Sequence, residues 1–134
     1  MPEPALIHIF LDLDGVLADF DHHAHEQGKR DDAGKMKHSE LDYQWWATMP
    51  VCEGAKEFYD AVQKIGVVKF LTAPFLDKEC FSGKAAWIEA FVPERGKFIL
   101  KDLIICASSD KRYACPHGGS GWSTTAVPIT KFQA

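Results

Sequence analysis

Two aspartates separated by one residue, Asp12 and Asp14, are the side chains of this chain best placed to do chemistry. They close the apolar stretch LIHIFLDLDG, and Gly15 follows them. Residues i and i+2 of a strand point to the same side, so the two carboxylates are expected to emerge together where a buried strand opens into a loop. One carboxylate can attack an electrophile as a nucleophile while the other moves protons. The alternative is a strand that simply ends in a polar turn.

The elements that must position these aspartates alternate along the chain. Apolar runs predict three strands, at 7–13, 67–71 and 103–107, the first buried on both faces. Apolar residues at helical spacing predict a helix over 54–66, which Gly66 ends, and another over 83–92, with Ser82 as its N-cap. This order predicts an α/β fold with a parallel sheet and right-handed crossovers.

A polar segment, residues 19–49, interrupts this order and is predicted to be a small, mostly helical insertion. Four of its residues are histidines, for which a solvated polar face is favoured over metal binding: His22, His23, His25 and His38. The residues from about 116 to 134 form an atypical tail that begins with glycine and serine. We therefore expect one domain over 1–134, with the insertion inside it.

Composition excludes several classes of function. The chain has 134 residues and a net charge of −4, which does not favour binding to a nucleic acid polymer. No apolar stretch is long enough to cross a membrane and the first residues lack the pattern of a signal peptide, so a cytoplasmic protein without a membrane partner is expected. The four cysteines are expected to be reduced. Metal binding by Cys115 and His117 is the less favoured alternative.

The segments DLDGVLADF, MPVCEGAKEFYDAV, FLTAP, CFSGKAAWIEAF and LIICASSDK, in this order, resemble the haloacid dehalogenase-like superfamily and its 5′(3′)-deoxyribonucleotidase branch. The resemblance implies a Rossmannoid parallel sheet with a small helical cap, residues 19–49. It also implies hydrolysis of phosphomonoesters through a phospho-aspartate, with Asp12 as the nucleophile and Asp14 as the acid and base. Mg²⁺ would bridge the Asp12 carboxylate, the Asp14 backbone carbonyl and the phosphate.

Phosphate-binding groups are expected after the second and third strands. The Thr72 hydroxyl and the following amide, that of Ala73, can hold a phosphate oxygen, although Thr72 could also simply end its strand. Lys111 matches by position the lysine of the family's third motif, with Lys97 and Lys101 as rivals.

Aromatic residues of the cap could stack on a nucleotide base: Phe20, Tyr43, Trp45 and Trp46. Packing of the cap onto the body of the protein is the alternative role for them, and the favoured one for any single residue.

The chain departs from the family at its C-terminal end, because no acidic residue follows Asp110 and the family's fourth motif is an acidic pair that binds magnesium. The tail is expected to be truncated or divergent. One possible coding sequence for residues 122–126, shifted by two bases, reads Val-Asp-Asp-Arg, so a frameshift is one hypothesis and natural divergence the other. The resemblance implies a central first strand with the strand of the fourth motif beside it, so without that neighbour the first strand would have an open edge. We expect residues 123–127 to cover it, with Pro128 limiting their length, or the chain to form a homo-oligomer there.

The expected function is a Mg²⁺-dependent phosphatase that acts on a small phosphorylated substrate, most favourably a deoxynucleoside monophosphate. The alternative is a catalytically impaired chain that only binds metal or phosphate. The missing fourth motif favours the alternative, and the presence of Asp12, Asp14, Thr72 and Lys111 favours the enzyme.

Overall fold

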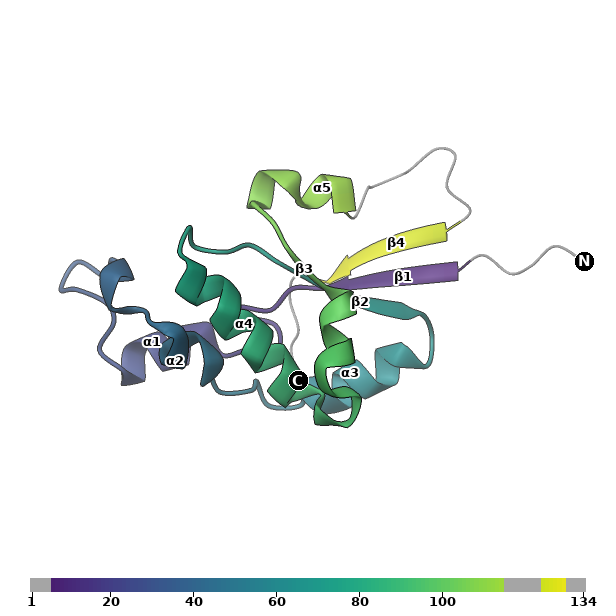
Figure 1. The fold of residues 1–134 in the computed structure, drawn as a ribbon, viewed down its shortest axis with the longest axis horizontal. Coiled ribbons are helices and arrows are strands. Elements are labelled where there is room, and N and C mark those ends of the chain that lie inside the picture. Colours follow the sequence, from purple (N-terminus) through teal and green to yellow (C-terminus); the bar gives the residue numbers. More distant parts are fainter. Residues whose placement is uncertain (1–5, 115–123, 130–134) are drawn as a thin grey trace, which may run out of the picture.

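The computed structural model describes residues 6–114 and 124–129, and it shows a parallel sheet with helices around it (Figure 1). The strands are β1 (Leu6–Leu11), β2 (Val67–Thr72), β3 (Leu103–Ile105) and β4 (Thr124–Ile129), in the spatial order β3-β2-β1-β4. The helices are α1 (Phe20–Glu26), α2 (Tyr43–Ala47), α3 (Ala55–Gln63), α4 (Lys78–Phe91) and α5 (Lys111–Ala114). Three 3-10 segments join them, η1 (His38–Glu40), η2 (Pro93–Asp102) and η3 (Ser108–Asp110). The predicted α/β class and parallel sheet are confirmed.

The two faces of the sheet bury different side chains, as the period of two along a strand requires. Ile9, Leu11 and Phe70 belong to the main core, together with buried residues of α3 and α4. Phe10 and Leu71 lie in a smaller cluster that includes Ala114 of α5. Figure 1 shows α3 and α4 on one side of the sheet and α5 on the other. Helices therefore cover both faces near the carboxyl ends of β1 and β2. The prediction that the first strand is fully buried is wrong at its start, where Ile7 is 39% exposed.

The edge of β1 that was expected to be open is covered by β4. The two strands pair in parallel, from Leu6 with Thr124 to Leu11 with Ile129. The prediction that the tail docks on this edge is thus confirmed, and β1 has no free edge through which copies of the chain could pair. Pro128 does not limit β4 as predicted, because β4 is an edge strand and Pro can be tolerated where its missing N–H would face solvent. Cys115, His117 and the remaining tail residues lie outside the described residues. The frameshift hypothesis stays a prediction.

Several predicted boundaries are wrong by a few residues. β1 ends at Leu11 rather than at 13, because the carbonyl of Leu13 accepts backbone N–H groups from the turn that follows, at 2.9–3.2 Å. Helix α4 begins at Lys78, and its N-cap is Asp77, whose side chain accepts from the Glu79 N–H. The predicted cap, Ser82, lies inside the helix and donates its hydroxyl to the Lys78 carbonyl at 3.0 Å. The third strand ends at Ile105 because the chain turns into η3.

Residues 19–49 are attached to α4, but they are not mostly helical as predicted, because a long stretch of turns with a bridge between Arg30 and Met36 separates α1 from η1 and α2. The Trp87 indole of α4 donates to the Met49 carbonyl at 2.6 Å, and the Tyr43 N–H at the start of α2 donates to Glu79 at 3.0 Å. Gly83 allows the close approach of α2, because a Cβ at this position would overlap the Cβ of Trp46. The insertion is therefore fixed on the helix that also reaches the carboxyl ends of the strands.

One of the four histidines in this segment is not part of a solvated face. His23 is 6% exposed and its Nε2–H donates to the Trp45 carbonyl at 2.9 Å, which ties α1 to α2. Burial lowers the pKa of His23 below its ordinary value of 6.5, although the hydrogen bond to Trp45 opposes the shift. The predicted polar face holds for His22, His25 and His38, which are exposed.

Pairing of β4 with β1 can be tested with proline substitutions. The Ile129 carbonyl accepts from the Asp12 N–H at 3.0 Å, and alternate residues of a strand direct their backbone groups to the same side. The N–H of Val127 therefore faces β1, whereas that of Ala126 faces away. We expect Val127→Pro to lower the free energy of unfolding by about 1–3 kcal/mol, since it leaves a carbonyl of β1 without its donor. The matched control Ala126→Pro should lower it by less than about 1 kcal/mol. Equal effects in urea unfolding would contradict the pairing.

His23 should make the stability of the protein fall at acid pH. The unfolded chain takes up a proton near pH 6.5 and the folded protein resists it, so the unfolded state binds more protons just below that pH. The stability is present above pH 6.5 and lost as the pH falls through this window. In His23→Gln, which keeps a donor for Trp45 but does not titrate, unfolding measured between about pH 5 and pH 7.5 should show a shallower loss than in the wild type. His25→Gln, on the exposed side of α1, should show the wild-type slope, and a shared slope in all three proteins would refute the assignment.

Candidate functional site

Asp12 lies directly after β1, and three contacts fix it. Its Oδ1 accepts from the Leu13 N–H at 2.7 Å, and its Oδ2 accepts from Nζ of Lys111 at 3.2 Å. Its own N–H donates to the carbonyl at the end of β4, at Ile129. The carboxylate thus stands at the carboxyl edge of a parallel sheet, where α/β folds place their ligands.

Asp14 lies in the turn that follows, next to Gly15, whose φ of 81° lies in the left-handed region that glycine adopts readily. Its Oδ2 accepts from Nζ of Lys84 at 3.1 Å. Its Oδ1 is buried and has no partner among the residues that the structure describes. Burial raises the pKa of the Asp14 carboxyl above its ordinary value of 3.8, although the charge of Lys84 opposes the shift. A carboxyl with a raised pKa and a free oxygen is suited to carry a proton.

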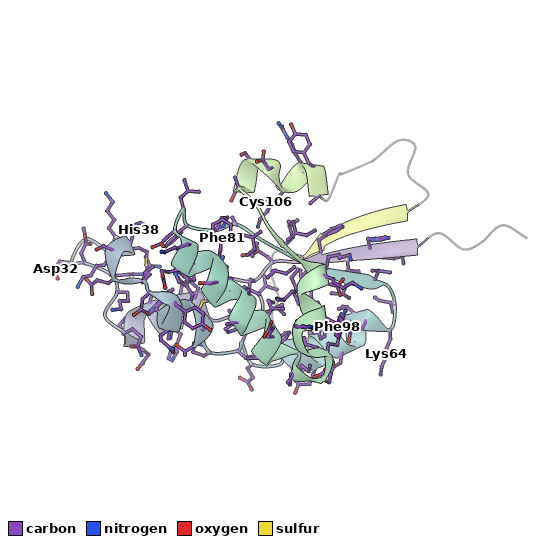
Figure 2. The ribbon with its side chains drawn as sticks, viewed as in Figure 1. Asp32, His38, Lys64, Phe81, Phe98 and Cys106 are labelled. Atoms are coloured by element: carbon purple, nitrogen blue, oxygen red, sulfur yellow. The ribbon has the colours of Figure 1, made fainter. Side chains whose placement is uncertain are left out.

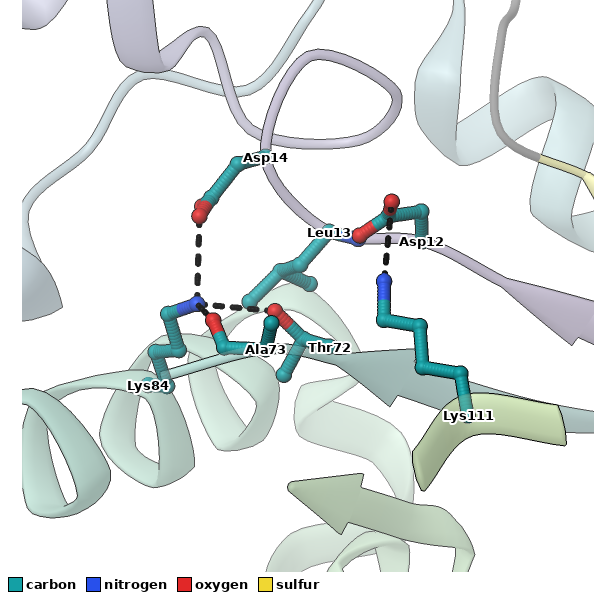
Figure 3. A network of polar contacts seen from close by, with 7 residues as sticks. All are labelled: Asp12, Leu13, Asp14, Thr72, Ala73, Lys84 and Lys111. Carbon is teal, nitrogen blue, oxygen red and sulfur yellow. Dashed lines mark hydrogen bonds and ion pairs between the residues drawn. The ribbon is translucent and has the colours of Figure 1, made fainter. Parts of the chain in front are cut away.

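Asp12 and Asp14 both follow β1 at this edge of the sheet, and each is paired with a different lysine (Figure 3). The rule of alternation along a strand does not explain this, since both residues lie beyond the end of β1. The turn after the strand sets their directions instead. Thr72 ends β2 between the two pairs in the view of Figure 3, and its carbonyl accepts from the Cys106 N–H at 3.1 Å. In a trans peptide the N–H points to the opposite side from the carbonyl. The Ala73 N–H, which was expected to hold a phosphate oxygen, therefore points away from Cys106.

Lys84 is the residue that sequence reasoning missed. Its side chain is completely buried, and it donates to Asp14, to Thr72 Oγ1 at 2.8 Å and to the Ala73 carbonyl at 2.7 Å. A signal was present in the sequence. Lys84 precedes Trp87 and Ile88 by three and four residues, so it lies on the apolar stripe of its helix. A lysine on such a stripe is rarely buried unless it is paired.

Lys111 reaches the site, whereas among the described residues neither Lys97 nor Lys101 forms a hydrogen bond or ion pair with Asp12 or Asp14. It is the first residue of α5, and its side chain is 25% exposed, so its charge remains open to a ligand. Lys97 lies over the ring of Phe98, with 5.8 Å between Nζ and the ring centroid, and Lys101 is exposed.

The aromatic residues of the cap lie mostly in the core. Trp45 and Trp46 are 4% and 1% exposed, and Phe20 packs edge-on against Trp45 with 5.5 Å between ring centroids. This burial favours the packing role that was the alternative for these side chains. Tyr43 is 38% exposed, at the start of α2.

A hollow of about 280 Å³ opens between the cap and the loop after β2. Its lining includes Trp46, Phe75 and His38, and the rings of His38 and Phe75 lie 4.5 Å apart, centroid to centroid. Figure 2 shows His38 on the cap near the start of α4. The ring of Trp46 also lies 5.3 Å from Nζ of Lys84, so Trp46 links the lining of this hollow, through Lys84, to Asp14.

The groups that the resemblance implies would hold Mg²⁺ are the Asp12 carboxylate and the Asp14 backbone carbonyl. Among the described residues no group of three or more His, Cys, Asp or Glu side chains could hold a metal. This donor set fits Mg²⁺ only as a weak site, because the ion commonly binds one or two carboxylates and takes its other ligands from water and substrate phosphate.

Comparison with models of protein families and with curated protein sequences finds no match to this chain. In the part of the chain that the structure describes, no helix has the length and apolar character needed to span a membrane.

Proposed function

We propose that this protein is a Mg²⁺-dependent phosphomonoester hydrolase of the haloacid dehalogenase-like type, which acts through a phospho-aspartate. The observation that carries the proposal is the arrangement of Asp12 and Asp14, each paired with its own lysine, at the carboxyl edge of the sheet beside Thr72. The position of β1 between β2 and β4 supports it as well, because the resemblance implies a central first strand.

The residues have separate roles in the proposed reaction. The Asp12 carboxylate attacks phosphorus and forms an acyl phosphate, while the P–O bond to the leaving group breaks. Asp14 gives its proton to the leaving oxygen, then takes a proton from the water that attacks the acyl phosphate, and inorganic phosphate and the Asp12 carboxylate result. Lys111 and the Thr72 hydroxyl bind the equatorial oxygens, where phosphoryl transfer most needs charge neutralisation. Bound Mg²⁺ supplies further positive charge beside the phosphate.

The leaving group is proposed to occupy the hollow lined by Trp46, Phe75 and His38. The aromatic rings that line this hollow can stack on a flat, partly polar group such as a nucleotide base. Stacking supports a nucleoside monophosphate as the substrate, and the resemblance adds the deoxy sugar and thus 5′(3′)-deoxyribonucleotidase activity. Phe75 and His38, rather than the buried Trp45, are then the residues that meet the base.

A second candidate is a chain that binds phosphate or metal with little turnover. The observation that favours it is the small set of acidic ligands near Asp12. If weak binding of Mg²⁺ removed about 3 kcal/mol of transition-state stabilisation, turnover would be slower by about 10²-fold.

Turnover of a generic aryl phosphate tests the proposal. With Mg²⁺ we expect measurable hydrolysis that a chelator abolishes. Asp12→Asn should remove it, since an amide is a poor nucleophile and a poor ligand, and Asp14→Asn should lower it by about 10²–10⁴-fold. Asp102→Asn is the matched control and should keep the activity. Asp102 is also paired with a lysine, Lys69, at 2.9 Å, but this pair lies in a different ion-pair group. Full activity of Asp12→Asn, once deamidation is excluded, would overturn the mechanism. Phosphate binding without turnover would favour the second candidate.

The proposed binding of the leaving group in this hollow leads to a separate prediction about substrate specificity. Phe75→Ala should lower kcat/KM for nucleoside monophosphates by about 10-fold, because base–aromatic stacking contributes about 1–3 kcal/mol per base. It should leave hydrolysis of a small aryl phosphate within about 3-fold. Phe98→Ala, which removes an exposed ring that does not line this hollow, should change neither. An equal loss for all substrates in Phe75→Ala would show that Phe75 supports the fold rather than the substrate.

A further inference from the structure

Lys84 has no donor left for a substrate. An ammonium group has three N–H bonds and no acceptor, and Nζ of Lys84 has three acceptors within hydrogen-bond distance: Asp14 Oδ2 at 3.1 Å, Thr72 Oγ1 at 2.8 Å and the Ala73 carbonyl at 2.7 Å. Its side chain is 0% exposed. A phosphate could bind this lysine only by replacing one of these partners.

The surroundings hold the ammonium in place. Gly83 lets α2 approach α4 closely, and this brings the ring of Trp46 to 5.3 Å from Nζ of Lys84. The negative face of an aromatic ring attracts a cation, most strongly when both are removed from water. The side chain of Lys84 therefore lies between the ring of Trp46 in the cap and the end of β2.

The contact with Thr72 determines what its hydroxyl can do. Because Lys84 can only donate, the oxygen of Thr72 must be the acceptor, and the single hydroxyl proton is directed to another partner. Likewise the contact with Asp14 holds Oδ2 and leaves Oδ1 without a partner among the described residues. One buried cation thus orients a proton donor for the phosphate and a carboxyl for the leaving group.

We propose that Lys84 is a positioning residue that orients Asp14 and the Thr72 hydroxyl and does not itself bind phosphate. Lys111, which is partly exposed, is the lysine that meets the phosphate. This inference rests on the proposed hydrolase function and divides its two lysines by role.

Kinetics of lysine variants on an aryl phosphate, with inorganic phosphate as a competing inhibitor, separate the two roles. In Lys84→Met we expect kcat to fall by about 10²-fold, the scale expected for misplaced reacting groups, with KM and the phosphate inhibition constant within about 3-fold. In Lys111→Met both constants should rise by about 10-fold or more, since a charged hydrogen bond to the ligand is lost. Lys69→Met, which breaks the ion pair with Asp102, should leave all three parameters unchanged.

Two results would overturn the inference. A phosphate inhibition constant that rises in Lys84→Met as much as in Lys111→Met would make Lys84 a phosphate ligand. An unchanged kcat with a lowered melting temperature would make it only structural. If Lys84→Met does not fold, Lys84→Arg decides the question. It keeps the charge, but its planar fork does not match three acceptors around one nitrogen, so kcat should fall while phosphate binding persists. Full kcat in Lys84→Arg would refute the positioning role.

A stability cycle keeps this inference separate from the proposed function. If the wild type does not hydrolyse any phosphomonoester, the proposed function fails. The effects of Lys84→Met and Thr72→Val on the melting temperature should still be non-additive, because the two side chains are in contact. Lys84→Met and Lys69→Met should be additive. Additive effects of Lys84→Met and Thr72→Val would show that the contact itself is absent.

Discussion

The buried ammonium of Lys84 is the interaction on which the arrangement of the site depends. A charged group at 0% exposure needs partners, and it finds them on the turn after β1 and at the end of β2. To bring it there, α4 must lie across the carboxyl ends of the strands. The same helix carries Gly83 and Trp87, which hold the cap. Helix α4 therefore sets the distances between the cap, Asp14 and Thr72.

The second constraint comes from the sheet. Because β1 lies between β2 and β4, the backbone on either side of Asp12 is fixed by neighbours, and its N–H is bonded to the last residue of β4. The proposed nucleophile thus directly follows a strand that has neighbours on both sides. The proposed acid, Asp14, stands on a turn and depends on a single side-chain partner, Lys84, for its direction. The two carboxylates thus differ in the contacts that hold them, which suits two different chemical roles.

Much of this could be predicted from local pattern. The strands and the turn of Asp12 and Asp14 follow from apolar runs, whereas the docking of the tail follows from the central first strand that the resemblance implies and from the need to cover its open edge. The start of α4 could not be predicted by looking for a serine cap, because Asp77, five residues earlier, caps the helix. Trp45 and Trp46 looked like candidates for base stacking, but their burial depends on how closely two helices approach, which a single glycine decides. Lys84 was missed although its place on the apolar stripe of α4 was a signal, because its partner Asp14 lies 70 residues away and cannot be identified from the local pattern.

The central claim is that a phosphoryl group passes through Asp12. Mass spectrometry of acid-quenched reactions tests it most directly, with the Asp14→Asn protein, Mg²⁺ and an aryl phosphate whose leaving group needs no proton. In this variant the acyl phosphate should still form but break down slowly, so the peptide that contains Asp12 should gain the mass of one phosphoryl group, located on Asp12. Hydrolysis by the wild type with no phosphorylated peptide in the variant, or with the group on another residue, would contradict the account.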